Sequence, residues 1–276
     1  MKKIILSIFA LAVMVAPVSA ATWVAADRVA PVGKILVEKN SLPNKISFKV
    51  VNGAADNSTV STTNIIQISS TDLTYAGNDN EVAAVISYQV GQIINGKEGK
   101  DKFRNAAKAA LAEKLSKDNI LNTAANSEFL NNKQSLADQK EADMTGVDLM
   151  INAGYNPLAM VVVITKMPGS NIEIALGKPA NSERAMSVYN YLLYNYESKV
   201  KVGYNCQEYR SFLTYADPIV AARNKSKRAL NKFKKEQEKI KAKRAKNLAQ
   251  YKATSGMSSW DATYTILNEL TTTKKK

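Results

Sequence analysis

A regular pattern of apolar residues runs through residues 81–95, which read EVAAVISYQVGQIIN. Apolar side chains recur there at intervals of three and four residues, a spacing that predicts a mostly buried helix. Asn78 and Glu81 have the spacing of a capping box, so they mark where this helix begins. We therefore expect the helix to be the central element of the fold.

The same patterns predict short strands and further helices around it. Alternating apolar residues predict strands over residues 46–51 and 64–69, which we expect to pair in a small antiparallel sheet. Residues 23–36 fit either a helix or a strand. Helical patterns lie at 101–115, 135–153, 156–168 and 181–196. Several helices around a small sheet define an α+β fold.

The first twenty residues have a different character. Lys2 and Lys3 precede an apolar run over residues 4–15, and small residues end the segment at 18–20. This order predicts a secretory signal peptide cleaved after Ala20. An uncleaved membrane anchor is the alternative, although the run is short for a bilayer span. We expect a secreted or periplasmic protein without a transmembrane segment in the mature chain.

The net charge of +14 is concentrated at the end of the chain. Residues 21–222 hold equal numbers of basic and acidic residues, so the basic excess of the mature chain lies in residues 223–276. We therefore divide the chain into the signal peptide (1–20), a main domain (21–217) and a basic helical tail (218–276).

The tail has the pattern of a long amphipathic helix. Apolar residues form a stripe at heptad spacing beside many basic ones: Leu230, Phe233, Ile240, Leu248 and Tyr251. Such a helix can pack on its own domain, pair with another helix, or lie on an anionic envelope surface through residues 223–246. We do not expect nucleic acid as the partner of an exported protein.

The content of cysteine, histidine and tyrosine limits the chemistry. Cys206 is the single cysteine, which excludes an internal disulfide, and the chain contains no histidine. Without histidine, Ser-His-Asp and Cys-His catalysis are both excluded. Tyrosines cluster between residues 189 and 209, where they serve either core packing or an aromatic binding surface.

Four segments together carry a resemblance, and the first is the strand and loop over residues 64–73 that leads into residues 80–85. Tyr88-Gln89-Val90-Gly91-Gln92 stands where a zinc-protease helix has HExGH, and Glu141-Ala142-Asp143 is followed by Ala153-Gly154-Tyr155-Asn156-Pro157. Lys178-Pro179 is followed by Arg184. In order and spacing, residues 69–184 resemble the HtpX-like and CAAX-prenyl-protease-like family of zinc metallopeptidases.

The resemblance implies a role for each position of the site. The two zinc-binding histidines of the family correspond to Tyr88 and Gln92, and the third ligand, a glutamate, corresponds to Gln139. Gln89 stands at the position of the general base. A histidine outside the ligand set corresponds to Lys178, while the outer-shell residues Asp143 and Arg184 are kept.

The substituted side chains do not suit zinc chemistry. A neutral phenol and neutral amides are poor zinc ligands, and Gln89 cannot take a proton from water. We therefore predict no cofactor and no hydrolysis. We also predict that Lys178 and the amides of Gln89, Gln92 and Gln139 fill the former metal pocket, with Lys178 beside Asp143 or Glu141.

These expectations predict an exported pseudo-peptidase, a binding or scaffold protein with a peptide or protein partner. Its peptide would add to the strand edge at Asn64, Ile65, Ile66, Gln67, Ile68 and Ser69. Two alternatives stay open. One is an active zinc metalloendopeptidase with an atypical site, and the other is an adaptor that binds anionic envelope surfaces through the basic tail.

Overall fold

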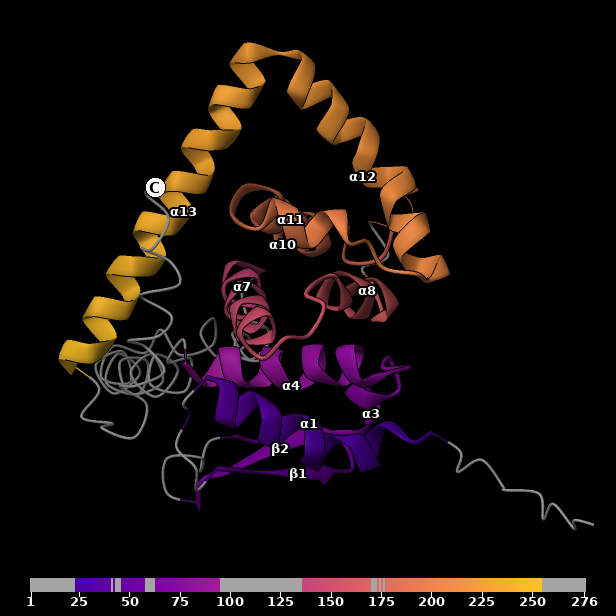
Figure 1. Cartoon of the computed structure of the whole chain (residues 1–276), viewed down its shortest axis with the longest axis vertical. Helices are drawn as coiled ribbons and strands as arrows, with labels where there is room; N and C mark the ends of the chain where they lie inside the picture. Colours follow the sequence, from indigo (N-terminus) through magenta and orange to yellow (C-terminus); the bar gives the residue numbers. More distant parts are fainter. Residues whose placement is uncertain are drawn as a thin grey trace, which may run out of the picture.

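A computed structural model of the chain describes residues 23–40, 42, 46–57, 63–94, 136–169, 173, 175 and 177–254 (Figure 1). In chain order the elements are α1 (Ala25–Lys39), β1 (Ser47–Val51), β2 (Ile65–Ser69), α3 (Ser70–Leu73), α4 (Asp79–Ile94), α7 (Leu136–Asn152), α8 (Leu158–Lys166), α10 (Ser182–Asn195), α11 (Glu197–Lys201), α12 (Gln207–Lys225) and α13 (Lys227–Thr254). The predicted signal peptide and the predicted helix at 101–115 lie outside the described residues.

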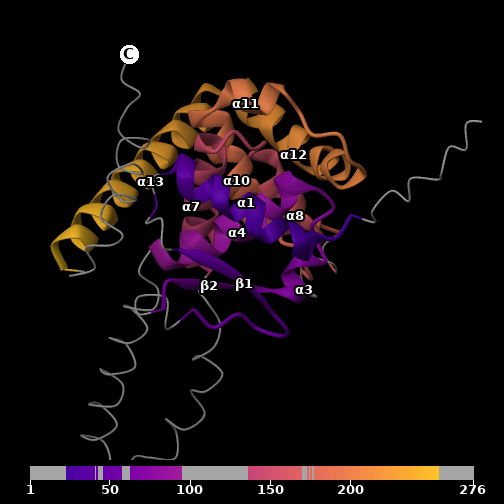
Figure 2. The ribbon, with the colours of Figure 1, turned by 60° about the horizontal axis from the view of Figure 1, so that its bottom comes forward.

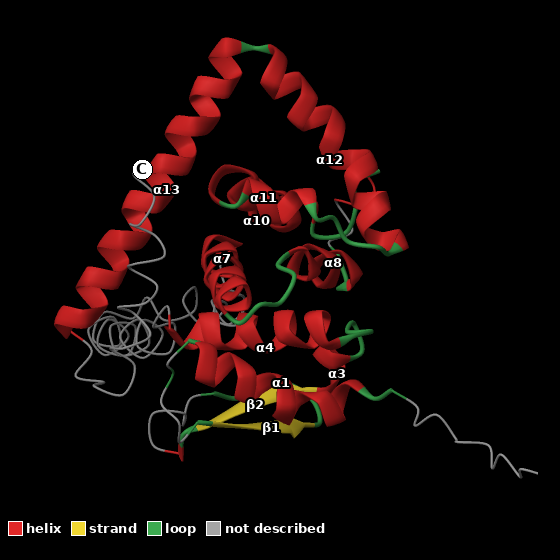
Figure 3. Cartoon of the chain, viewed as in Figure 1, coloured by secondary structure: helices red, strands yellow, loops and turns green. Residues whose placement is uncertain are grey.

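The elements are stacked in layers with α4 in the middle (Figures 1 and 3). On one side α1 packs between α4 and β1, and β2 also contacts α4. On the other side lie α7 and α8, and α10 packs on both of them. The outermost helices are α12 and α13, which meet near Ser226 and diverge from there (Figure 1). The α+β prediction is confirmed as a helical fold with a small sheet.

Helix α4 is the buried centre that its sequence pattern predicts. Residues 81–91 are all buried. Asn78 Oδ1 accepts hydrogen bonds from the backbone nitrogens of Asn80 at 3.0 Å and Glu81 at 3.2 Å. The Glu81 carboxylate accepts one from the Gly77 backbone nitrogen at 2.8 Å. Because these contacts satisfy donors at the start of the helix, the predicted cap is confirmed.

The sheet corrects one prediction, because β1 and β2 run parallel and not antiparallel. Ser47 pairs with Ile65 and Val51 with Ser69. The two strands lie side by side in Figure 2. A parallel pair needs a crossover of about a dozen residues or more, while a tight turn joins only antiparallel strands. The chain between the strands, residues 52–64, supplies that length, so the two strands are not a hairpin.

The basic region also differs from its prediction. The expected domain boundary at residues 217 and 218 falls inside α12, which runs on to Lys225. Ser226 then interrupts the basic helix with an extended conformation, and its Oγ accepts a hydrogen bond from the Ala229 backbone nitrogen at 3.2 Å. This serine cap ends one helix and starts the next. None of the helices in the described ranges is long and apolar enough to cross a bilayer.

Candidate functional site

The positions that the resemblance assigns to zinc ligands and the general base lie along α4 and at the start of α7. Tyr88 and Gln89 are buried, with 9% and 8% of their surfaces exposed, and Gln92 is half-buried one turn further on. Gln139 is half-buried in α7, one turn before Asp143, so the two share a face of that helix. The structure therefore places these positions on two helices that pack against each other.

A buried ion pair covers Tyr88. Arg184, on α10, donates from Nε to Asp143 Oδ2 at 2.6 Å and from Nη2 to Asp143 Oδ1 at 2.8 Å. The guanidinium carbon of Arg184 lies 4.6 Å from the centre of the Tyr88 ring, within range of a cation–π contact. Burial raises the pKa of the Asp143 carboxyl, and the charge of Arg184 opposes that rise. The site thus contains a cation that the protein itself supplies.

The Tyr88 hydroxyl stays neutral over the physiological range. Burial raises the pKa of Tyr88 to about 12, although the charge of Arg184 and a hydrogen bond with Gln92 act in the opposite direction. A phenolate would therefore not be present to bind a metal at neutral pH.

Gln89 belongs to a second polar group that sequence reasoning missed. Its Nε2 donates to Asp72 Oδ2 and its Oε1 accepts from Asn57 Nδ2, each at 3.5 Å. Burial raises the pKa of the Asp72 carboxyl, and the hydrogen bond from Gln89 lowers it. Asp72 lies in α3, directly after β2, so its approach to α4 depends on the strand-to-helix turn capped by Ser69. The sequence carries no spacing signal for this contact.

The prediction for Lys178 is wrong. Its side chain is exposed and does not fill the space beside Asp143 or Glu141. Arg184 occupies the place beside Asp143 instead, with two parallel hydrogen bonds that a lysine ammonium cannot make. The predicted amide network stays a prediction: Gln92 bonds Tyr88, while Gln89 bonds Asp72 and Asn57 in a separate group.

The proposed peptide-binding edge of β2 is partly covered by the chain itself. The Ser47 backbone nitrogen donates to the Asn64 carbonyl, so Ile65, Gln67 and Ser69 direct their backbone groups to the outer edge. At Gln67, the Asn57 side chain accepts from the backbone nitrogen at 2.7 Å and donates to the carbonyl at 3.3 Å. Asn57 therefore takes the place that a neighbouring strand would have.

A second buried charge group joins α13 to the main domain. The Asp148 carboxylate accepts hydrogen bonds from the Tyr191 hydroxyl at 2.8 Å, the Tyr196 hydroxyl at 2.9 Å and Arg244 Nη2 at 2.9 Å. Arg244 Nη1 lies 3.5 Å from Glu141 Oε1. Burial raises the pKa of Asp148, and Arg244 opposes that rise. Tyr191 is buried and Tyr196 is half-buried, which fits the packing alternative, and the hydroxyls of both face a buried carboxylate.

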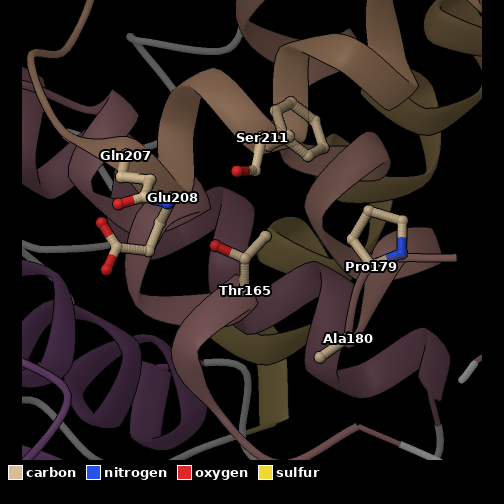
Figure 4. A pocket seen from close by; sticks show the side chains of 7 residues that line it. Thr165, Pro179, Ala180, Gln207, Glu208 and Ser211 are labelled. Carbon is tan, nitrogen blue, oxygen red and sulfur yellow. The ribbon is translucent and has the colours of Figure 1, made fainter.

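A cavity of about 470 Å³ lies away from these groups, between α8, α12 and the chain at Pro179 and Ala180 (Figure 4). Thr165, Gln207, Glu208 and Ser211 supply its polar side chains, and Phe212 contributes an apolar wall. Gln207, Glu208 and Ser211 are exposed. The cavity is therefore an open surface hollow, and it offers no buried charged group to orient a ligand.

Zinc does not fit the residues at Tyr88, Gln92 and Gln139, the positions that the resemblance assigns to its ligands. They offer a neutral phenol and neutral amides, and the Arg184 cation lies against Tyr88. Within the described ranges, no three histidine, cysteine, aspartate or glutamate side chains are arranged to hold a metal ion. No protein-family model matches the chain, and no curated protein or solved structure matches it. A relation to zinc metallopeptidases therefore rests on the sequence resemblance and is a proposal.

Proposed function

We propose that the chain is an exported pseudo-peptidase that works by binding and not by hydrolysis. The observation that supports this proposal is the buried, neutral Tyr88 phenol at a position that the resemblance assigns to a zinc ligand. In an active relative, a zinc ion would be the cation at the centre of the site. Here that ligand position carries a neutral phenol, which is a poor zinc ligand, and the Arg184 guanidinium that covers its ring is paired with Asp143.

The chemistry at Gln89 supports the same proposal. A general base must accept a proton from water, and a neutral amide does not do so near neutral pH. The Gln89 amide is instead placed between Asp72 and Asn57. Its role under this proposal is to connect α4, α3 and the chain before β2.

An extended peptide is the partner that we propose for the outer edge of β2. Such a peptide would pair with the backbone of Ile65, Gln67 and Ser69 by strand addition. At Gln67 it would have to replace the Asn57 side chain, which already supplies one donor and one acceptor there. The edge therefore favours partners whose additional contacts outweigh those two hydrogen bonds.

The test measures zinc content, casein cleavage and casein-peptide binding for the chain from Ala21 onward. We expect no stoichiometric zinc, no chelator-sensitive cleavage, and binding of the peptide without its hydrolysis. The control variant carries Tyr88→His, Gln89→Glu, Gln92→His and Gln139→Glu, which restores the ligand set that the resemblance implies. We expect this variant to bind one zinc ion per chain, because two histidines four residues apart share one face of a helix. One zinc per wild-type chain with chelator-sensitive cleavage would instead establish the active-enzyme alternative.

The exposed charges of α13 favour a second function, attachment to an anionic surface. Most of the basic side chains between Lys225 and Lys243 are exposed, while the two acidic residues there, Glu236 and Glu238, lie near Lys232 and Tyr194. Such an excess of cations attracts anionic surfaces over a Debye length, which is about 8–10 Å at moderate salt.

A further inference from the structure

Helix α13 presents a line of cations on one face. Arg228, Lys232, Lys235, Lys239 and Lys243 follow one another at intervals of three or four residues, so they lie one above another along the helix. All five side chains are exposed. The line, which we name the basic stripe, extends over about 22 Å of helix. One acidic residue flanks the stripe: Glu236 Oε1 lies 3.9 Å from Lys232 Nζ.

The opposite face of α13 is turned toward the rest of the protein. Gln237 and Arg244 are buried there, with 7% and 2% of their surfaces exposed. The Phe233 ring meets the Tyr194 ring edge to face at 6.0 Å, and the Arg223 guanidinium lies 3.7 Å from the centre of the Phe233 ring. The apolar edge that an interfacial helix would insert into lipid is thus already used for packing.

The side chains of the stripe are suited to a surface of diffuse negative charge. Lysine reaches an anionic group as a flexible point charge and does not require one fixed geometry. Binding to single-stranded nucleic acid uses aromatic rings for base stacking, and Phe233 lies on the opposite face of the helix. A row of four to eight cations on a helix is the pattern that recognises anionic lipid headgroups.

We propose that the basic stripe attaches the protein to a bilayer rich in anionic lipid, by charge alone and without insertion of apolar side chains. This inference rests on the second proposed function, and it assigns that function to five residues and to one mode of binding. The Arg244–Asp148 contact holds α13 on the main domain, so the stripe faces outward in a fixed orientation.

The experiment measures sedimentation of the chain from Ala21 onward with two kinds of vesicle. One contains phosphatidylcholine with phosphatidylglycerol, and the other contains phosphatidylcholine alone. We expect binding only to the first kind, and its loss at about 1 M salt, where the Debye length is about 3 Å. Binding that persists at that salt concentration would indicate insertion and overturn the proposal.

A pair of charge-matched variants tests the residues of the stripe. Lys232→Glu, Lys235→Glu and Lys239→Glu together should weaken vesicle binding by more than about tenfold. The control carries Lys49→Glu, Lys178→Glu and Lys199→Glu, which change the net charge equally at exposed positions elsewhere. Circular dichroism should show equal helix content in both variants. The control should bind almost as well as the wild type.

The outcomes distinguish a failure of the second proposed function from a failure of its assignment to the basic stripe. If the wild-type chain does not bind the anionic vesicles, the second proposed function fails together with this inference. If the wild type binds but the two triple variants weaken it equally, attachment stands and the assignment to the stripe is overturned. Binding to duplex DNA without binding to vesicles would also overturn the proposal.

Discussion

At the scale of single residues, the decisive feature is a buried, neutral Tyr88 phenol beneath the Arg184–Asp143 ion pair. Arg184 reaches Asp143 with two parallel hydrogen bonds and covers the Tyr88 ring. The identities of Tyr88, Gln89 and Gln92, and hence their neutral side chains, are known from the sequence alone. The exposed position of Lys178 could not be predicted from the sequence, because a flexible lysine side chain can point either into a site or out to solvent.

Titration of Tyr88 provides a prediction at this scale. The pKa of its hydroxyl is about 12 in the folded protein, against about 10 in an unfolded chain. Because folding raises this pKa, Tyr88 contributes stability that is complete below pH 10 and is lost as pH rises through about 12. The free energy of unfolding of Tyr88→Phe should therefore fall less steeply over that interval, by an amount on the order of 2 kcal/mol.

Urea unfolding of the wild type and of Tyr88→Phe at several alkaline pH values measures this difference. The two proteins should differ in the pH dependence of their unfolding free energies above pH 10. Parallel curves over that interval would contradict the buried, neutral phenol.

At the scale of elements, the close approach of α4 and α7 fixes the geometry of the site. A Cβ atom added at Gly91 would lie 2.4 Å from the Ala142 carbonyl oxygen, closer than unbonded atoms approach. On the facing helix, a Cβ atom at Gly146 would lie 3.0 Å from the Ser87 backbone. These glycines allow two helix backbones to cross almost in contact, which aligns Tyr88 with Asp143 and Arg184.

Gly91→Ala is predicted to destabilise the protein in spite of alanine's higher helix propensity. Propensity alone would add about 1 kcal/mol of stability. The contact with the Ala142 backbone forces the helices apart, and overpacking of this kind costs about 1–3 kcal/mol. We expect a net loss in the free energy of unfolding, measured by urea denaturation.

Gly77→Ala is the matched control, because its added Cβ would meet only the Glu81 carboxylate at 3.6 Å. This variant should keep nearly the stability of the wild type. Equal stability of Gly91→Ala and the wild type would mean that α4 and α7 do not pack this closely.

At the scale of the whole molecule, the basic helix α13 is part of the fold. Arg244 lies 96 residues along the chain from Asp148, yet the two side chains form a buried ion pair with 2% and 0% of their surfaces exposed. Two tyrosine hydroxyls complete the hydrogen bonding of Asp148. Helix α13 is therefore fixed on the main domain by a polar contact, while the basic side chains of its other face stay exposed.

Arg244→Met is expected to destabilise the protein strongly. It leaves the Asp148 carboxylate buried without its cation, and breaking such a pair costs about 3–5 kcal/mol. The double variant Arg244→Met with Asp148→Asn should lose less, because no buried charge is left unpaired. Urea unfolding gives both free energies, and limited trypsin digestion should show faster cleavage in α13 of the single variant.

Lys234→Met serves as the control for this prediction, since Lys234 is an exposed cation of the same helix. Its free energy of unfolding should lie within about 0.5 kcal/mol of the wild-type value. If Arg244→Met changed the free energy of unfolding equally little, the contact with Asp148 would not be what holds α13 on the main domain.

The sequence by itself determined the elements whose signals are local. Apolar periodicity and the Asn78 cap define α4, β-type alternation defines the two strands, and the charge distribution marks the basic helix. It also determined that no histidine is present to bind zinc. Short-range spacing and side-chain chemistry suffice for these conclusions.

Only the tertiary structure decided the relations between distant segments. Strand direction depends on how β1 and β2 pack beside α1 and α4, and the partner of Asp143 depends on how α10 packs on α7. The contact of Arg244 with Asp148 depends on the break at Ser226. Each relation joins residues far apart in the chain. Their pairing is fixed by packing and by the cost of leaving buried charges without a partner, which local sequence patterns do not encode.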